Sequence, residues 1–178
     1  MKTLKTIVAA CLLFISVGAV AQNEKDIKIM KDAEKAKTML MEKDAGFEKF
    51  FSTASGYVIF PNVGKGGLII GGASGNGVVY EYGKAVGMAD LKEISVGLKA
   101  GGQAITEVIF FETDVALADF KEGNFEFAAE ASAVAVDKGV SKDANYSDGV
   151  VVFTMPKAGL MADLSVGGQK FSYKAFKK

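Results

Sequence analysis

The side chains of this chain that could do chemistry are carboxylates, lysines, tyrosines and hydroxyls, because the sequence has no His, no Trp and no Arg. Its one cysteine is Cys11. The usual His and Cys ligand sets for zinc, copper or non-haem iron, and the Ser-His-Asp and Cys-His nucleophile systems, cannot be built from such a chain. Acid-base chemistry by Asp, Glu, Lys or Tyr, Ser-Lys nucleophile pairs and oxygen-bound calcium or magnesium remain available.

A catalytic site would require acidic residues that act as a pair. The candidates are Asp90, Glu93, Glu107, Glu112 and Asp163. Nothing in their spacing marks a general acid and a general base, and acidic residues at strand ends and turns are usually solvated. We therefore expect a protein that is not an enzyme, with no catalytic residues, no metal site and no cofactor.

The first 21 residues are expected to be a signal peptide. Lys2 and Lys5 precede an apolar stretch, and Ala19-Val20-Ala21 gives the small-x-small pattern of a cleavage site. The stretch is shorter than the roughly 20 apolar residues of a membrane span. The sequence therefore predicts an exported protein that is periplasmic, envelope-associated or secreted.

Cys11 decides the redox chemistry of the mature chain. It follows Val8-Ala9-Ala10, which resembles a lipoprotein acylation site, so lipidation is an open alternative to cleavage after Ala21. With cleavage, the mature chain has no thiol, hence no disulfide, and must be stabilised by packing in one domain. The formal net charge of the whole chain is zero, so nucleic acid is not an expected partner.

Residues 22–55 read as a helical segment. From Asn23 to about Met41, apolar residues recur at helical spacing, which predicts an amphipathic helix. One stripe comprises Ile29, Ala33, Ala36 and Leu40, and a second comprises Ile27, Met30 and Met41. Three phenylalanines after Gly46 predict a short second helix that ends near Ser55 and Gly56 and belongs to the core.

Residues 56–178 read as a glycine-rich, β-rich domain that forms one globular unit with the helical segment. The expected strands lie at Tyr57–Phe60, Leu68–Ile70, Val78–Tyr82, Ile94–Leu98, Ile105–Phe111, Phe125–Val136, Val150–Met155 and Leu160–Val166. Many short strands between glycine or polar turns indicate an α+β fold with a strongly curved antiparallel sheet or a barrel-like β domain. One helix, over Asp114–Lys121 with Asp114 as its cap and Gly123 as its stop, interrupts the strands.

A glycine-rich stretch between residues 64 and 77 invites comparison with a phosphate-binding loop. It lacks the GxxxxGK[ST] and GxGxxG spacings, and a strand follows it. We expect these glycines to permit bends and close packing, and Gly75-Asn76-Gly77 to turn a hairpin. The residues expected to be structural glycines are Gly64, Gly66, Gly67, Gly71, Gly72, Gly75, Gly77, Gly97, Gly101, Gly159 and Gly168.

Three segments follow one another in a fixed order: Phe60–Gly67 with Gly71-Gly72 and Gly75-x-Gly77, then Ser95–Gln103, then Ala158–Gly168. Together they resemble the SYLF domain family of lipid-binding domains. The resemblance runs from roughly Phe47 to Tyr173 and implies binding to membrane lipid, with an amphipathic N-terminal helix contributing. The chain departs from the pattern at Lys99, Asp163 and Gly167. The phosphoinositides and actin of eukaryotic relatives are not carried over to an exported protein.

The function expected from these observations is lipid-binding by a membrane-associated protein of the cell envelope. The partner would be membrane lipid or another apolar ligand, and a protein partner is unknown. The residues expected to contact lipid are Lys25, Ile27, Lys28, Ile29, Met30, Lys31, Lys35, Leu40 and Lys65. The alternative is a structural or protein-interaction module of the envelope with no lipid ligand, in which the helix packs permanently on the sheet.

Overall fold

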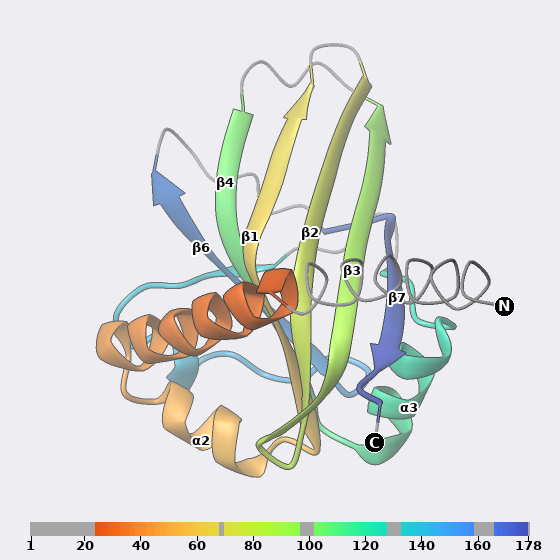
Figure 1. Ribbon diagram of the computed structural model, residues 1–178. Helices are drawn as coiled ribbons and strands as arrows, with labels where there is room; N and C mark the ends of the chain where they lie inside the picture. The colour runs from red at the N-terminus through yellow and green to blue at the C-terminus, as the bar shows by residue number, and fades with distance from the viewer. Residues whose placement is uncertain (1–23, 68–69, 97–101, 128–132, 159–165, 178) are drawn as a thin grey trace, which may run out of the picture.

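The computed structural model describes residues 24–67, 70–96, 102–127, 133–158 and 166–177. Seven strands form one sheet in the order β5-β6-β4-β1-β2-β3-β7 (Figure 1). All neighbours are antiparallel except β5 and β6, which are parallel. The strands are β1 (Gly56–Gly67), β2 (Ile70–Glu81), β3 (Lys84–Val96), β4 (Gly102–Phe111), β5 (Val134–Ala135), β6 (Val150–Ala158) and β7 (Gln169–Ala175).

The sheet is strongly curved. Four strand spacings separate β4 from β7 in the strand order, about 19 Å in a flat sheet. Yet the Gln169 side-chain nitrogen on β7 lies 3.1 Å from a Glu107 carboxylate oxygen on β4. The sheet therefore folds over on one side, and this side is the concave face.

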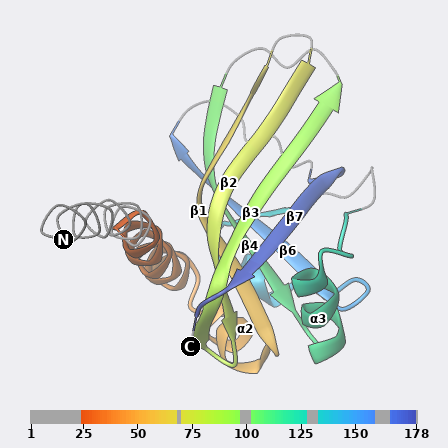
Figure 2. The ribbon, with the colours of Figure 1, turned by 45° about the vertical axis from the view of Figure 1, so that its right-hand side comes forward.

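Each face of the sheet carries its own hydrophobic core. The convex-face core contains Tyr57, Val108, Phe110 and Phe153, and the concave-face core contains Phe60, Ile109, Phe111 and Phe171. A helix over residues 24–43 and α2 (Phe47–Thr53) pack on the convex face, whereas α3 (Asp114–Glu122) packs on the concave face (Figure 2). A short 3-10 helix, η1 (Val140–Lys142), also lies beside the convex-face core.

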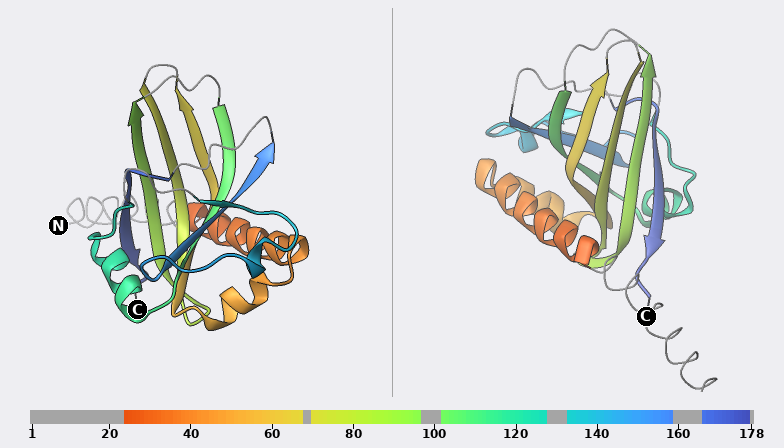
Figure 3. Two further views of the ribbon diagram at one scale, coloured as in Figure 1. Left: turned by 180° about the vertical axis from the view of Figure 1, so that it is seen from behind. Right: turned by 45° about the horizontal axis from the view of Figure 1, so that its top comes forward.

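Seen from behind, β6 crosses diagonally over the sheet, and the helix of residues 24–43 lies beyond it (Figure 3). Residues 24–43 are called the N-terminal helix below. The helix spans only one end of the long strands β1 to β4, so the other end of their convex face extends past it. This edge of the helix is where a pocket forms.

The predicted fold class, α+β with a strongly curved antiparallel sheet, is confirmed, and the sheet is not closed into a barrel. The expected helices near residues 23–41, 47–55 and 114–121 are present. Several strands differ from expectation. The strands β1, β2 and β3 are longer than the apolar runs that predicted them, and β7 was not predicted.

The hairpin expected at Gly75-Asn76-Gly77 is wrong. These residues lie inside β2 and pair with both β1 and β3. The chain turns instead at Tyr82 and Gly83, whose φ angles of 46° and 77° are both positive. Two successive positive φ angles are what a tight type I′ hairpin requires, and only Gly adopts them without strain.

The strand expected over Phe125–Val136 is not continuous, and residues 128–132 of it lie outside the described residues. The only strand among its described residues is β5, at Val134–Ala135. Residue Glu126 forms one isolated bridge to Lys170. Most of the strand expected at Leu160–Val166 lies outside the described residues, as do the expected structural glycines Gly97, Gly101 and Gly159.

The helix α3 is capped by Thr113 rather than by Asp114. The Thr113 side-chain oxygen accepts a hydrogen bond from the Ala116 backbone nitrogen at 3.2 Å. Gly123, with a φ angle of 75°, ends the helix as expected. Asp114 is the first helical residue, where its charge still favours the helix N-terminus.

We expect Thr113→Ala to lower the free energy of unfolding by about 1 kcal/mol, because one helix N–H loses its acceptor. Urea unfolding measures the change, with Thr38→Ala on the N-terminal helix as the control. The Thr38 hydroxyl bonds within a helix interior and caps nothing. Equal losses in the two variants would contradict the capping role.

Candidate functional site

The N-terminal helix is fixed to the convex face by apolar and polar contacts. Ala33, Ala36 and Leu40 are buried against the core. The Lys37 ammonium donates to the Tyr57 hydroxyl at 3.0 Å, and the Tyr80 hydroxyl donates to Glu34 at 2.8 Å. Burial, and then the bond to Glu34, raise the pKa of Tyr80 far above its usual range. The middle of this helix is therefore part of the folded core.

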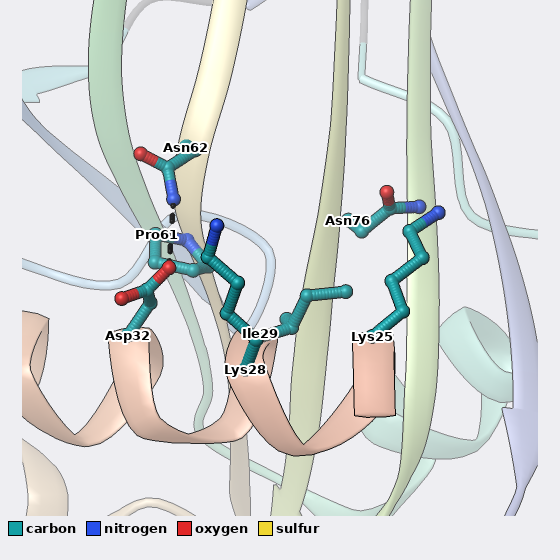
Figure 4. A pocket seen from close by; sticks show the side chains of 7 residues that line it. All are labelled: Lys25, Lys28, Ile29, Asp32, Pro61, Asn62 and Asn76. Carbon is teal, nitrogen blue, oxygen red and sulfur yellow. Dashed lines mark hydrogen bonds between the residues drawn. The ribbon is translucent and has the colours of Figure 1, made fainter. Parts of the chain in front are cut away.

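The first turns of the same helix border a pocket of about 260 Å³ (Figure 4). The helix contributes Lys25, Lys28, Ile29 and Asp32. Residues three or four positions apart lie on the same side of a helix, so these four form one stripe. The facing residues come from β1 and β2. The lining consists of Lys25, Lys28, Ile29, Asp32, Pro61, Asn62 and Asn76.

A bulge in β1 shapes the sheet side of this pocket. The register of β1 shifts between Ile59 and Asn62, at Pro61, which has no N–H to give to a neighbouring strand. The Thr106 hydroxyl donates to the Pro61 carbonyl at 3.2 Å. After the bulge, Asn62 stands directly opposite Asn76 on β2. Both amides thereby border the helix.

The polar groups of the pocket are arranged as amide-carboxylate pairs with free lysines beside them. Asn62 donates to Asp32 at 3.4 Å, and Asn76 donates to Asp90 on β3. Lys157 donates to the other side of the Asn62 amide. Within the part of the chain that the structure describes, the ammonium groups of Lys25 and Lys28 have no hydrogen-bonding or ion-pair partner. Figure 4 shows both extending toward the two asparagines.

A second hollow of about 220 Å³ continues past Asn62 and Asn76 along the convex face. It adds the polar side chains of Ser74, Asp90 and Lys92. The two hollows share both asparagines, so they form one polar groove at the edge of the helix.

The structure brings three of the nine expected lipid-contact residues together in the pocket, namely Lys25, Lys28 and Ile29. The side chain of Ile27 is 44% exposed, outside the pocket lining and on a different side of the helix from these three residues. Met30 is half-buried against the core, and Lys31 and Lys35 are exposed outside the pocket lining.

Leu40 and Lys65 lie elsewhere. Leu40 is 1% exposed in the convex-face core, so it can reach an acyl chain only if the helix leaves the sheet. Lys65 is 8% exposed, and its ammonium lies 3.9 Å from a Glu93 carboxylate oxygen. Lys65 is two residues after Val63 of the concave-face core, and side chains two positions apart on a strand point to the same face. Lys65 therefore lies on the face away from the N-terminal helix.

A buried polar cluster around Lys65 was not predicted. The expectation that Glu93 and Glu107 are solvated is wrong, because they are 5% and 0% exposed. Gln169 joins them by donating to Glu107 at 3.1 Å and to Glu93 at 3.4 Å. Register explains the grouping: Lys65 and Glu93 both flank Ala73, and Gln169 is opposite Glu93. The small Ala73 side chain leaves room for the cation and the carboxylate to meet.

Burial raises the pKa of Glu107 to about 7, against the opposing effects of the Gln169 hydrogen bond and the Lys65 charge. Its Oε1, the Gln169 side-chain oxygen and the Thr154 hydroxyl have no hydrogen-bond partner among the described residues. Thr154 is directly opposite Glu107 on β6. Because Glu107 is buried and its Oε1 accepts no hydrogen bond among the described residues, its surroundings favour the neutral carboxylic acid.

Among the residues that the structure describes, no three His, Cys, Asp or Glu side chains are grouped as metal ligands. Within the same ranges, no helix has the length and apolar character needed to cross a membrane.

A protein-family model matches part of this chain. The family model described as Ysc84, Las17-binding protein actin regulator, matches residues 92–175. These residues run from β3 to the end of β7 and include α3. No curated protein matches the chain.

Proposed function

Because the chain carries a domain of the SYLF (Ysc84) family, matched over residues 92–175, we propose that it is a non-catalytic lipid-binding protein of the cell envelope. It associates with membranes through the first turns of its N-terminal helix. The family is linked to lipid binding and to actin regulation. Only the lipid link is carried over, because a protein exported by the signal peptide expected from the sequence would not meet cytoplasmic actin.

The observation that carries this proposal is the pocket at the edge of the helix. Two ammonium groups, those of Lys25 and Lys28, have no partner among the described residues and line the pocket together with the apolar Ile29. Cations at headgroup level next to apolar side chains are the arrangement of an interfacial helix. The middle of the helix stays on the sheet, so the contact involves its first turns alone.

The affinity is expected to be modest. A lysine near an anionic surface contributes about 1 kcal/mol, and nearby carboxylates such as Asp32 subtract from this. The chain has a formal net charge of zero, so no long-range attraction to an anionic bilayer adds to it.

A protein-interaction module is the second candidate, and the seating of the helix favours it. Ala33, Ala36 and Leu40 are buried, and Lys37 and Glu34 are hydrogen-bonded to tyrosines of the sheet. A helix held in this way is a permanent part of the domain. In this case the exposed lysines would be solvated and would bind no lipid.

We expect the double variant Lys25→Ala/Lys28→Ala to bind vesicles of phosphatidylethanolamine and phosphatidylglycerol roughly thirtyfold more weakly. Loss of two headgroup contacts costs about 2 kcal/mol. Co-sedimentation of the mature protein with the vesicles at low salt measures the change. The matched control is Lys43→Ala, at an exposed position on the same helix outside the pocket.

Binding that falls equally in the control variant would show nonspecific charge attraction and contradict a site at the pocket. No sedimentation of the folded wild-type protein would leave the interaction module as the better explanation. Urea unfolding of each variant verifies that the fold is intact.

A further inference from the structure

The polar groove beside the N-terminal helix contains both signs of charge. Lys25, Lys28 and Lys92 supply cations, and Asp32 and Asp90 supply anions. A site for a purely anionic headgroup would not need carboxylates in its lining, because each carboxylate repels a phosphate. The two aspartates therefore call for a ligand group that they attract.

Each aspartate is held by an amide instead of an ammonium. Asp32 accepts from Asn62 at 3.4 Å, and Asp90 accepts from Asn76. No lysine ammonium lies within ion-pair distance of either carboxylate among the described residues. The two negative charges are thus positioned but not neutralised. Each carboxylate keeps lone pairs free to accept from a cation.

These groups follow one line across the sheet. Asn62, Asn76 and Asp90 are consecutive cross-strand partners, and Asp32 joins the line at Asn62. Two strand spacings, about 10 Å, separate Asn62 from Asp90. In Figure 4, Lys28 extends beside Asn62 and Lys25 extends beside Asn76. Each asparagine therefore has an ammonium beside it and a carboxylate bound to it, so both signs of charge occur at each amide.

We infer that this groove recognises a phosphate-ammonium zwitterion of the kind that a phosphoethanolamine headgroup carries. The phosphate binds Lys28 or Lys25, and the primary ammonium donates to Asp32 or Asp90. This inference rests on the proposed function in taking the zwitterion from a membrane lipid. The pocket of about 260 Å³ would hold about nine water molecules, which suits a phosphate joined to a two-carbon amine.

The same chemistry separates ethanolamine from choline. A primary ammonium has N–H donors for the carboxylates, whereas the quaternary ammonium of choline has none. Recognition of choline normally uses an aromatic cage, and none of the described residues that line the two hollows is aromatic. Vesicles of phosphatidylcholine are therefore the matched control, to which weaker binding is expected.

The test compares vesicles of phosphatidylcholine alone with vesicles that also contain phosphatidylethanolamine or phosphatidylglycerol. We expect wild-type protein to bind the ethanolamine vesicles about tenfold more tightly than choline vesicles. Asp32→Asn or Asp90→Asn is expected to remove that preference. Glu42→Gln, at an exposed position on the same helix, is the control and should keep it. Urea unfolding confirms that each variant folds.

Equal binding of choline and ethanolamine vesicles, or a preference that survives both aspartate variants, would overturn the inference while the proposed function stands. Absence of binding to every vesicle would overturn the proposed function. Titration of the protein with soluble phosphoethanolamine tests the inference separately from the proposed function. If the compound binds, and Asp32→Asn or Asp90→Asn weakens this binding, the inferred recognition of the zwitterion is supported even without membrane binding.

Discussion

Replacing Glu107 by Gln is expected to stabilise the protein by about 3 kcal/mol near pH 8 and to change its stability little near pH 4.5. Glu107 is fully buried, and burial raises its pKa from 4.5 to about 7. At pH 8 the wild type must therefore keep a charged carboxylate inside the sheet or lose its fold. A glutamine of the same shape carries no charge at any pH and keeps an oxygen that can accept from the Gln169 side-chain nitrogen.

The direction follows from proton counting. Between about pH 4.5 and pH 7 the folded state holds a proton on Glu107 that the unfolded state has released. The stability contributed by this proton is complete below the unfolded pKa and is lost as pH rises through the folded pKa. The charged groups that face Glu107 are Lys65 and Glu93, joined to it through Gln169. All three remain in the variant.

Urea unfolding at a series of pH values, for wild type and variant together, measures the effect. The difference between the two free energies of unfolding should grow from pH 4.5 to pH 8, because other titrations cancel. Glu48→Gln, at an exposed position on α2, should show no such growth. A constant difference for Glu107→Gln would mean that this carboxyl titrates normally in the folded protein.

Local signals predicted the helices well. The spacing of Ala33, Ala36 and Leu40 identified the buried stripe of the N-terminal helix, and all three are in the core. The Gly123 stop and the helix before it are also present. Caps and helical periodicity depend on residues a few positions apart, so a single sequence contains them.

The sheet was harder to predict because its order depends on distant partners. Gly75 and Gly77 look like turn residues, but their neighbours on β1 and β3 determine that they lie within a strand. Strand β7 was missed because the expected strands followed continuous apolar runs, whereas β7 alternates Phe171, Tyr173 and Ala175 with polar residues. Such alternation is typical of a strand that buries one face.

The candidate site was predicted in part. Lys25, Lys28 and Ile29 share a helix face that the sequence displays directly. Asn62 and Asn76 were missed as pocket residues, because a bulge at Pro61 and the β1–β2 register bring them to the helix. Register cannot be read from either strand alone. The burial of Glu107 was missed for the same reason, since its partners come from β3 and β7.

We expect Gly77→Ala to lower the free energy of unfolding by about 3 kcal/mol, at the upper end of overpacking costs. An added Cβ would lie 2.6 Å from the Phe60 ring and 2.7 Å from the Ile59 carbonyl oxygen. The ring could turn only by disturbing the concave-face core, and the carbonyl belongs to the β1 backbone. The midpoint of thermal unfolding should fall by about 6 to 12 °C.

Gly64→Ala is the matched control, because Gly64 is also a strand glycine and a Cβ there meets nothing within 4 Å. We expect this variant to gain about 0.5 kcal/mol, since alanine loses less backbone freedom on folding than glycine. A loss of stability in Gly77→Ala and a gain in Gly64→Ala would show that Gly77 is required by the close approach of neighbouring atoms. It would also show that Gly64 only leaves the convex face flat. Equal losses would mean that both positions need glycine for backbone conformation, which the ordinary φ angles of these two residues argue against.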